Sequence, residues 1–442
     1  MKLRKLLACV LVVMMMVTAL AACGSKDDSK EGKGSDSTTE NSGKDDDSND
    51  STDYSGKKLT VGIWGGNDAE EAAINKVKDD FEALTGASVE FKVYTDYNTQ
   101  LQADFIGQTA PDVFYVDGAM FAFYSSLEVM EVLDPAEMGT DAYYENLLGA
   151  FTTDGGDILC IPKDVSTLAT YYNTDMLEAV GMTGDDIPEA LEEYPAFLTD
   201  LQAKLDEEYG AGQVTAMSYN HDLSRMLHLL ERDGASIAND DDSANLSDAA
   251  VLDNFKIIME LVDTGAYKTP SEVGLGWNGE AFGAEKIAIM EEGNWVYKTL
   301  VDDFSDVNFG VKDMPSYNGE KSSMSFTVGY GVYAGSDEKE LAKEWIRYAT
   351  GVEGMTTWCS GAGCLPSRDD VAENMDVRSD DVWATHLDQQ AYAKPWQAGI
   401  NIDTINSNFQ NFFPGATKGE TTIAEAMEKA DSQANSEIGN AQ

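Results

Sequence analysis

The 442-residue sequence has few of the side chains that most often carry catalysis or bind metals. Its three histidines are His221, His228 and His386, and none lies in a His-Glu-x-x-His pattern, which argues against a zinc protease. His221 and His228 are seven residues apart, but one pair supplies too few ligands for a metal site. The sequence also contains no Gly-x-Ser-x-Gly elbow and no Walker-type phosphate loop. We therefore expect no catalytic residue, no metal and no cofactor.

Positive charge is also scarce. The chain has 30 lysines and arginines against 79 aspartates and glutamates, a formal net charge of -49. Such a surface repels the phosphates of nucleic acids and anionic lipid headgroups, so no nucleic-acid partner is expected. With so many carboxylates, some pair would lie at glycosidase distance by chance, and an acidic pair therefore identifies no enzyme.

The five cysteines do not form a disulfide framework, because Cys9 and Cys23 lie in the N-terminal segment and three remain. No Cys-x-x-Cys occurs, so neither a zinc ribbon nor a thioredoxin-like site is indicated. Cys359 and Cys364 could close a small loop outside the cell. They could equally remain two unpaired, small apolar side chains, and the sequence leaves both possibilities open.

Long apolar runs are missing too. The longest, residues 6–20, is shorter than the about 20 residues that a membrane span needs. Three basic residues precede it and Leu-Ala-Ala-Cys follows, which is the layout of a secretory signal peptide over 1–22. Cys23 resembles the cysteine of a bacterial lipobox, which implies a palmitate-bearing lipid anchor there. We predict a protein held by this lipid on the extracellular face of the bacterial cell membrane.

The rest of the chain divides into a tether and a folded part. Residues 23–56 are rich in Asp, Ser, Gly, Lys and Asn, cannot bury a core, and are predicted to be a disordered acidic spacer. About 385 residues follow, more than one hydrophobic core usually holds, so two lobes are expected.

The folded part opens with an α/β pattern. Residues 59–64 read as a strand, and apolar residues at helical spacing follow from Ala73 to Leu84, with Asp68 as the expected N-cap. Residues 89–93 and 113–116 read as further strands. This alternation predicts a parallel sheet with helices on its faces, and ligands of such sheets bind beyond the carboxyl ends of the strands.

The tryptophans are the strongest chemical signal. Six of the seven lie outside clear apolar helical stripes: Trp64, Trp277, Trp295, Trp358, Trp383 and Trp396. An aromatic face suits the C–H face of a sugar ring, while nearby carboxylates, amides and arginines bind its hydroxyls. For any single tryptophan the alternative is core packing, which we expect for Trp345.

Two consecutive segments make a more specific pattern. Residues 276–283 (GWNGEAFG) and 286–295 (KIAIMEEGNW) resemble the signature of family 1 extracellular solute-binding proteins, the sugar receptors of ABC importers. The resemblance extends from about residue 57 to the end of the chain. Supporting segments are 110–117, 161–167, 325–330, 354–358 and 365–368. The cysteines at 359 and 364 are a departure from the family pattern.

The resemblance implies an α/β, two-lobe, periplasmic-binding-protein-like fold with a hinge and a ligand cleft between the lobes. Lobe 1 would comprise residues 57–162 plus 307–350. Lobe 2 would comprise residues 163–306 plus 351–442.

It also implies a set of ligand-binding residues. Lys163 and Asp164 would lie where the chain first crosses the hinge, and Tyr330 near the returning crossing. Trp295 matches the stacking tryptophan of the family. The first lobe would contribute Trp64, Asn67, Asp68 and Asp117. The second lobe would contribute Asn220, Arg225, Trp277, Glu280, Trp295 and Trp396.

The function implied is that of a lipid-anchored, monomeric receptor that binds a sugar or oligosaccharide and delivers it to the permease of an ABC transporter. Two alternatives remain open. One is a secreted carbohydrate-active enzyme that uses two acidic residues. The other keeps the binding fold but takes a non-sugar ligand, and the acidic charge argues modestly against a phosphate.

Overall fold

The computed structural model describes residues 53–441, so the predicted signal peptide, Cys23 and most of the predicted tether lie outside the described residues. Contacts with the folded part begin before the first strand. The Tyr54 N–H donates to the Thr85 carbonyl at 2.8 Å, and the Tyr54 ring packs against buried apolar residues. The last residues of the predicted 23–56 tether therefore already touch the folded region.

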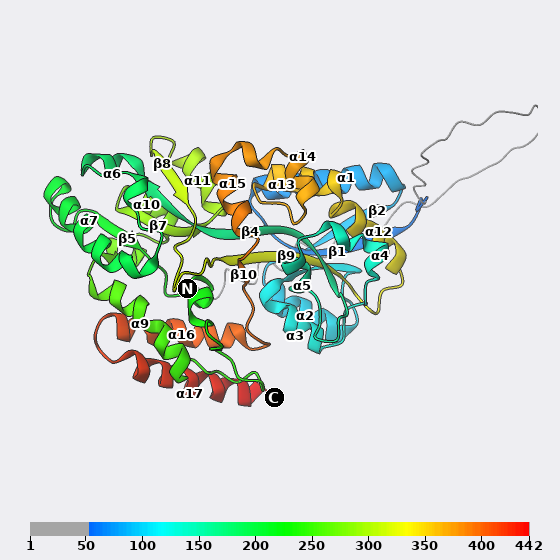
Figure 1. Cartoon of the computed structure of the whole chain (residues 1–442). Coiled ribbons are helices and arrows are strands. Elements are labelled where there is room, and N and C mark those ends of the chain that lie inside the picture. Colours follow the sequence, from blue (N-terminus) through cyan, green and yellow to red (C-terminus); the bar gives the residue numbers. More distant parts are fainter. Residues whose placement is uncertain (1–52, 442) are drawn as a thin grey trace, which may run out of the picture. The chain divides into compact units, whose positions relative to one another are not determined.

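A ten-stranded sheet organises the described residues (Figure 1). Its order is β2-β1-β3-β9-β4-β7-β5-β6, with β10 paired to β9 and β8 paired to β4. The first three strands are parallel, as predicted, and β9 runs antiparallel to both β3 and β4. The strands are β1 (Lys58–Trp64), β2 (Ser88–Tyr94), β3 (Val113–Asp117), β4 (Cys160–Asn173), β5 (Thr215–Ser218), β6 (Tyr267–Lys268), β7 (Ile287–Gly293), β8 (Phe309–Lys312), β9 (Met324–Val332) and β10 (Lys394–Pro395).

In the first lobe, helices cover both faces of β1, β2 and β3. Along β3 the side chains alternate: Val113 and Tyr115 enter one core, while Phe114 and Val116 enter the other. The first of these, here called the first-lobe core, packs against α1 (Asp68–Thr85), α12 (Lys339–Ala349) and α13 (Val352–Ala362). The second packs against α2 (Tyr97–Gly107) and α3 (Phe121–Ser126) on the opposite face (Figure 1).

The start of α1 differs by one residue from the sequence-based expectation. Asn67, not Asp68, is the N-cap, and its side chain accepts from the N–H groups of Ala69 and Glu70. Glu70 returns a bond to the Asn67 N–H, which completes a capping box. Asp68 is instead the first residue of the helix and is exposed.

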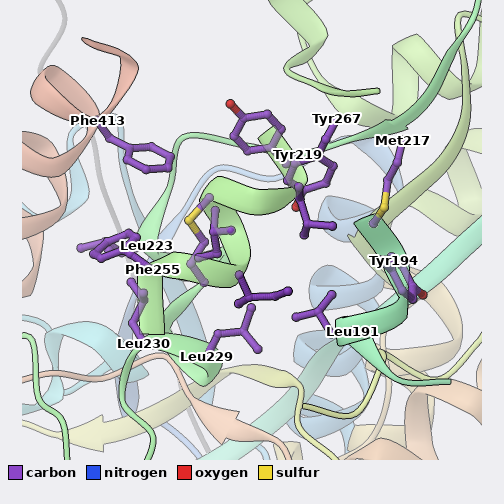
Figure 2. Close-up of a cluster of buried hydrophobic side chains, with 14 of the residues drawn as sticks. Leu191, Tyr194, Met217, Tyr219, Leu223, Leu229, Leu230, Phe255, Tyr267 and Phe413 are labelled. Carbon is purple, nitrogen blue, oxygen red and sulfur yellow. The ribbon is translucent and has the colours of Figure 1, made fainter. Parts of the chain in front are cut away.

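The second lobe is built around a larger core, here called the second-lobe core. It buries apolar residues of α7 (Tyr194–Tyr209), α9 (Ala249–Asp263), α16 (Ile402–Thr417) and α17 (Ile423–Ala441). Figure 2 shows part of it, where the rings of Tyr219 and Tyr267 stack with centroids 4.3 Å apart. On the opposite side of β7, a smaller core packs against α10 (Asn278–Gly283) and α11 (Trp295–Asp303).

Two long strands are shared by both lobes. Ile161 of β4 lies in the first-lobe core, whereas Leu168 lies in the second-lobe core. The returning strand β9 behaves likewise, with Tyr330 in the first-lobe core and Met324 in the second. The β4–β9 register shifts between Pro162 and Asp164, so Lys163 lies at an irregularity where the chain crosses from one lobe to the other.

Two segments pack against the opposite lobe from the one predicted for them. The exact boundaries of the lobes stay a prediction. Residues 351–442 were expected in lobe 2, but α13 contributes Met355, Trp358 and Cys359 to the first-lobe core. Residues 307–350 were expected in lobe 1, but β8 pairs with the end of β4 beside the smaller core of the second lobe. The remaining helices are α4 (Pro135–Met138), α5 (Glu145–Gly149), α6 (Thr174–Ala179), α8 (Leu227–Leu230), α14 (Asp369–Asn374) and α15 (Asp381–Gln389).

Between residues 53 and 441, none of the helices combines the length and the apolar character needed to cross a bilayer.

The close approach of α13 to α1 gives a stability prediction. A Cβ at Gly361 would lie 2.7 Å from the Cβ of Ala73, which is closer than real Cβ atoms pack. We expect Gly361→Val to lower the free energy of unfolding by about 1–3 kcal/mol, because α13 must shift away from α1. Urea denaturation followed by circular dichroism measures this change.

The matched control is Gly439→Ala in α17, where an added Cβ meets nothing within 4 Å. Because alanine favours helix over glycine, this variant should be neutral or more stable by up to about 1 kcal/mol. Equal destabilisation by both substitutions would show that the α1–α13 contact is not the cause.

Candidate functional site

A cavity of about 780 Å³, here called the main cavity, lies where β4 and β9 pass between the lobes. This volume is in the range of sites that enclose small ligands. Polar and aromatic residues from both lobes form its walls. The polar lining residues are Asn67, Glu70, Glu71, Asn75, Asp117, Lys163, Asp164, Ser166, Arg225, Asn294, Lys298, Thr299, Asp302, Asp303 and Thr327, and the larger aromatic ones are Trp64, Phe91, Tyr115, Trp295, Phe326 and Trp358.

Trp64 and Trp295 lie on this cavity from different lobes. Trp64 ends β1, and its ring is held edge-on by Tyr97 and Tyr115, with centroids 5.0 Å and 4.8 Å away. Trp295 begins α11, and Phe326 of the crossing strand β9 packs edge-on against it at 5.3 Å. Such edge-to-face contacts fix the ring planes while leaving the remaining indole surface for a ligand.

Lys163 and Asp164 form a charged centre at the crossing. The Lys163 ammonium is ion-paired with the Asp164 carboxylate, and the residue is 3% exposed. It also lies 3.9 Å from the Trp358 ring centroid. Burial is the largest single influence and opposes the charge, but the negative charges of Asp164, Cys364 and Tyr330, together with the hydrogen bond to Asp164, outweigh it and raise the pKa of Lys163. Lys163 therefore stays charged, with Asp164 as its counter-ion.

Asp164 also connects Trp358 to this centre. The Trp358 indole N–H donates to the Asp164 carboxylate at 2.8 Å, which fixes the ring at the cavity wall. The hydroxyl of Thr327 donates to the Asp164 main-chain carbonyl at 2.8 Å, joining β9 to β4 at the same point. One aspartate thus positions the lysine, the indole and the crossing strands together.

Arg225, which is half-buried, and Glu292, which is buried, form a second ion pair. The guanidinium donates to the carboxylate at 2.9 Å, and Glu292 is 2% exposed. The guanidinium also lies 5.1 Å from the centroid of the Trp295 ring. Within the described residues, the Nε of Arg225 and the side-chain nitrogen of Asn294 are buried donors without a partner.

Asp117 lies at the carboxyl end of β3. Its carboxylate accepts from the Ala119 N–H at 2.8 Å and so caps η1 (Gly118–Met120). Burial raises the pKa of Asp117 from 3.8 to about 6, and the negative charges of Asp403 and Asp164 add to the shift. The backbone hydrogen bond opposes this shift but does not cancel it.

The structure brings together nine of the thirteen residues proposed from the sequence as ligand-binding. Seven of them line the main cavity: Trp64, Asn67, Asp117, Lys163, Asp164, Arg225 and Trp295. Asn220 and Trp277 line an adjoining cavity of about 250 Å³. Arg225 and Trp295 lie on both cavities and form the wall between them.

The other four residues are placed away from these two cavities. Asp68 is exposed on the first turn of α1, and the Glu280 carboxylate accepts from the Gly276 N–H at 2.9 Å. Tyr330 is 2% exposed in the first-lobe core, with its ring 5.2 Å from that of Tyr115. Trp396 packs against the second-lobe core after β10. Their proposed ligand contacts are not supported by this geometry.

Several lining residues were missed by the sequence-based reasoning. Trp358 belongs to segment 354–358, which carries the family resemblance, and this membership is the sequence feature that points to it. Glu71 and Asn75 of α1, and Lys298 and Asp302 of α11, are each four residues apart and share a helix face at the cavity. Because many exposed helix faces carry such polar residues, their spacing gave no reason to single them out.

Among residues 53–441, no group of three or more histidine, cysteine, aspartate or glutamate side chains is arranged to hold a metal ion.

Comparison with known proteins assigns the chain to a family. Residues 76–387 match the family described as bacterial extracellular solute-binding protein. The chain belongs to this family. Its members are binding proteins, and the main cavity of this solute-binding protein is lined from both lobes.

One sequence relative and two solved structures are similar over most of the solute-binding protein. The diacetylchitobiose-binding protein DasA of Streptomyces coelicolor (strain ATCC BAA-471 / A3(2) / M145) is 24% identical over 402 residues, which covers 84% of each chain. The sugar-binding protein MalE of Xanthomonas citri superimposes with a TM-score of 0.75 at 15% identity, covering 87% of this chain and 98% of that one. The ABC substrate-binding protein Lmo0181 of Listeria monocytogenes, solved with cycloalternan, gives a TM-score of 0.70 at 18% identity, covering 87% and 99%. The structural likenesses show the shared two-lobe fold.

The raised pKa of Asp117 predicts a pH-dependent stability difference. The pKa of Asp117 is higher in the native state than in the unfolded chain. The protonated carboxyl therefore stabilises the native state fully below about pH 4, and this stabilisation is lost as the pH rises through about 6. Asp117→Asn removes this loss. The stability of the variant minus that of the wild type should therefore increase by roughly 1–3 kcal/mol between pH 4 and pH 7.

Urea denaturation at pH 4, 5, 6 and 7 measures the difference. Asp154→Asn, at an exposed turn, is the control and should give a difference that does not change with pH. A constant offset for Asp117→Asn would contradict the assigned pKa shift.

Proposed function

We propose that this protein is an extracellular receptor that binds a sugar or oligosaccharide and delivers it to an ABC importer. The observation that carries the proposal is the main cavity, where indole rings from separate lobes face one space beside carboxylates and amides. Indole faces suit the C–H faces of sugar rings, and the polar groups suit their hydroxyls. The names of the relatives agree, since they bind diacetylchitobiose or sugar or were solved with cycloalternan.

The charges in the main cavity favour a neutral ligand. Its three basic lining residues are all ion-paired, Lys163 with Asp164, Arg225 with Glu292 and Lys298 with Asp302. Among the described residues that line the cavity, no cationic side chain is therefore left unpaired to bind a phosphate or carboxylate ligand.

Hinge closure is the proposed mechanism. The lobes are joined through β4 and β9, and a sugar that touches both lobes makes contacts in the closed form that the open form does not offer. The ligand therefore shifts the population toward the closed form. We propose that the ABC permease recognises this form and that the receptor acts as a monomer without a cofactor.

The proposed location follows from the N-terminal sequence. A signal peptide over 1–22 and lipidation of Cys23 with palmitate would hold the protein at the extracellular face of the cell membrane. Labelling cells with a palmitate analogue tests this, because Cys23→Ser should lose the label and be released into the medium. A labelled Cys23→Ser variant would contradict lipidation at this residue.

A thermal-shift screen tests the ligand class. The panel contains N,N′-diacetylchitobiose, maltose, longer malto-oligosaccharides, glycerol 3-phosphate and a tripeptide. A ligand at 100 times its dissociation constant stabilises the native state by about 2.7 kcal/mol, so a binding sugar should raise the melting temperature. A shift with glycerol phosphate or the peptide and with none of the sugars would contradict the proposal. Sustained release of product from an oligosaccharide would instead support the enzyme alternative.

Trp295 provides the sharpest mutational test. We expect Trp295→Ala to weaken binding of the sugar found in the screen by roughly tenfold or more, because a largely buried aromatic contact is lost. Isothermal titration calorimetry measures the affinity, and a thermal melt confirms that the variant is folded. Trp383→Ala is the matched control, since Trp383 packs against Tyr297 away from both cavities. Unchanged affinity in Trp295→Ala would remove this residue from the site.

A further inference from the structure

The C-terminal end of α13 brings two cysteines together. Gly363 ends the helix in the left-handed conformation, with φ 70° and ψ 44°. The N–H groups of Gly363 and Cys364 both donate to the carbonyl of Cys359, at 2.9 Å and 3.2 Å. In helix ends of this kind, the side chains at the positions of residues 359 and 364 commonly touch. An interaction in which the Cys364 thiol donates to the Cys359 side chain contributes to the raised pKa of Cys364, which agrees with this contact.

The two thiols differ in their access to solvent. Cys359 is 1% exposed and belongs to the first-lobe core. Cys364 is partly exposed and lines the main cavity. The third cysteine of the described part, Cys160, is fully buried elsewhere in the first lobe, with its sulfur 3.5 Å from that of Met130. Only Cys364 among these three therefore faces a space that a small reagent can enter.

The neighbours of Cys364 belong to the ligand cavity. Its thiol lies 3.9 Å from the Asp164 carboxylate, the group that also holds Lys163 and Trp358. Across the cavity, a Cβ placed on Gly363 would lie 3.6 Å from the side chain of Lys298 in α11 of the second lobe. A covalent change at this helix end thus occurs where the two lobes approach each other.

We propose that Cys359 and Cys364 form a redox site in the wall of the ligand cavity, where they close reversibly to a disulfide. The oxidant is a low-molecular-weight disulfide that enters the cavity. The Cys364 thiolate attacks one sulfur of this reagent and expels one thiol, leaving a mixed disulfide on Cys364. The Cys359 thiolate then attacks the Cys364 sulfur and expels the second thiol. In total, two protein thiols and one small disulfide give one protein disulfide and two small thiols.

The surroundings set the rate of the first step. The hydrogen bond that the Cys364 thiol donates to Cys359, burial, and the negative charges of Cys359 and Asp164 raise the pKa of Cys364 well above its usual value, although the nearby Lys163 ammonium opposes this shift. Since the thiolate is the attacking species, closure should be slow near neutral pH and faster as the pH rises. The geometry of the helix end favours the second step, because Cys359 is already beside the Cys364 sulfur.

The test uses the folded full chain and oxidised glutathione at pH 7 and pH 9. After remaining thiols are alkylated, peptide mass mapping should show a peptide pair linked through Cys359 and Cys364, formed faster at pH 9. Dithiothreitol should restore both thiols. A glutathione adduct on Cys364 that persists without closing, or unmodified cysteines 359 and 364 at both pH values, would overturn the proposal.

Three variants separate the steps. Cys359→Ser should accumulate the glutathione adduct on Cys364, because the second attacking thiol is missing. Cys364→Ser should leave Cys359 unmodified, because the remaining thiol is buried. Cys160→Ala is the matched control and should close to the disulfide at the wild-type rate. If Cys364→Ser reacted while Cys359→Ser did not, the proposed order would be wrong. None of these measurements requires a sugar, so their outcome is independent of the proposed function.

Discussion

The antiparallel pairing of β4 with β9 is the constraint on which the rest of the structure depends. Each strand contributes apolar side chains to the cores of both lobes, so the lobes cannot separate without breaking this ladder. The ladder also fixes the floor of the main cavity, since Lys163, Asp164 and Ser166 of β4 lie beside Thr327 and Phe326 of β9. Because one pair of strands forms both the connection and the floor, a change in the angle between the lobes is felt directly at the ligand cavity.

Charge pairing decides what this cavity can hold. A lysine as buried as Lys163 is stable only with a counter-ion, and Asp164 supplies it from the adjacent position. The Arg225–Glu292 pair repeats this arrangement on the other side. Each pair leaves an aromatic ring beside it, Trp358 in the first case and Trp295 in the second. The cavity therefore offers oriented indole surfaces and neutralised cations, which is the combination that an uncharged, hydroxyl-rich ligand requires.

The outcome for individual residues shows how far sequence patterns reach. The alternation of strands and helices predicted the parallel β1–β2–β3 unit, and strand ends correctly placed Trp64 and Asp117 at the cavity. Tyr330 was assigned to the site because it belongs to the returning strand. In the β3–β9 register it lies opposite Tyr115, two residues beyond the cavity-lining Val328, and is covered by the first-lobe core. Register along a buried strand depends on the partner strand, which the local sequence does not specify.

The sequence by itself determined the family and the α/β alternation, because these are carried by residue type and local spacing. It also indicated six of the aromatic and charged residues of the cavity: Trp64, Asp117, Lys163, Asp164, Arg225 and Trp295. Only the tertiary structure decided that α13 joins the first-lobe core and brings Trp358 and Cys364 to the cavity. It alone paired Arg225 with Glu292, which are separated by 67 residues. The physical reason is that packing partners and ion pairs are chosen by which surfaces meet after the chain has folded, and no local pattern records that choice.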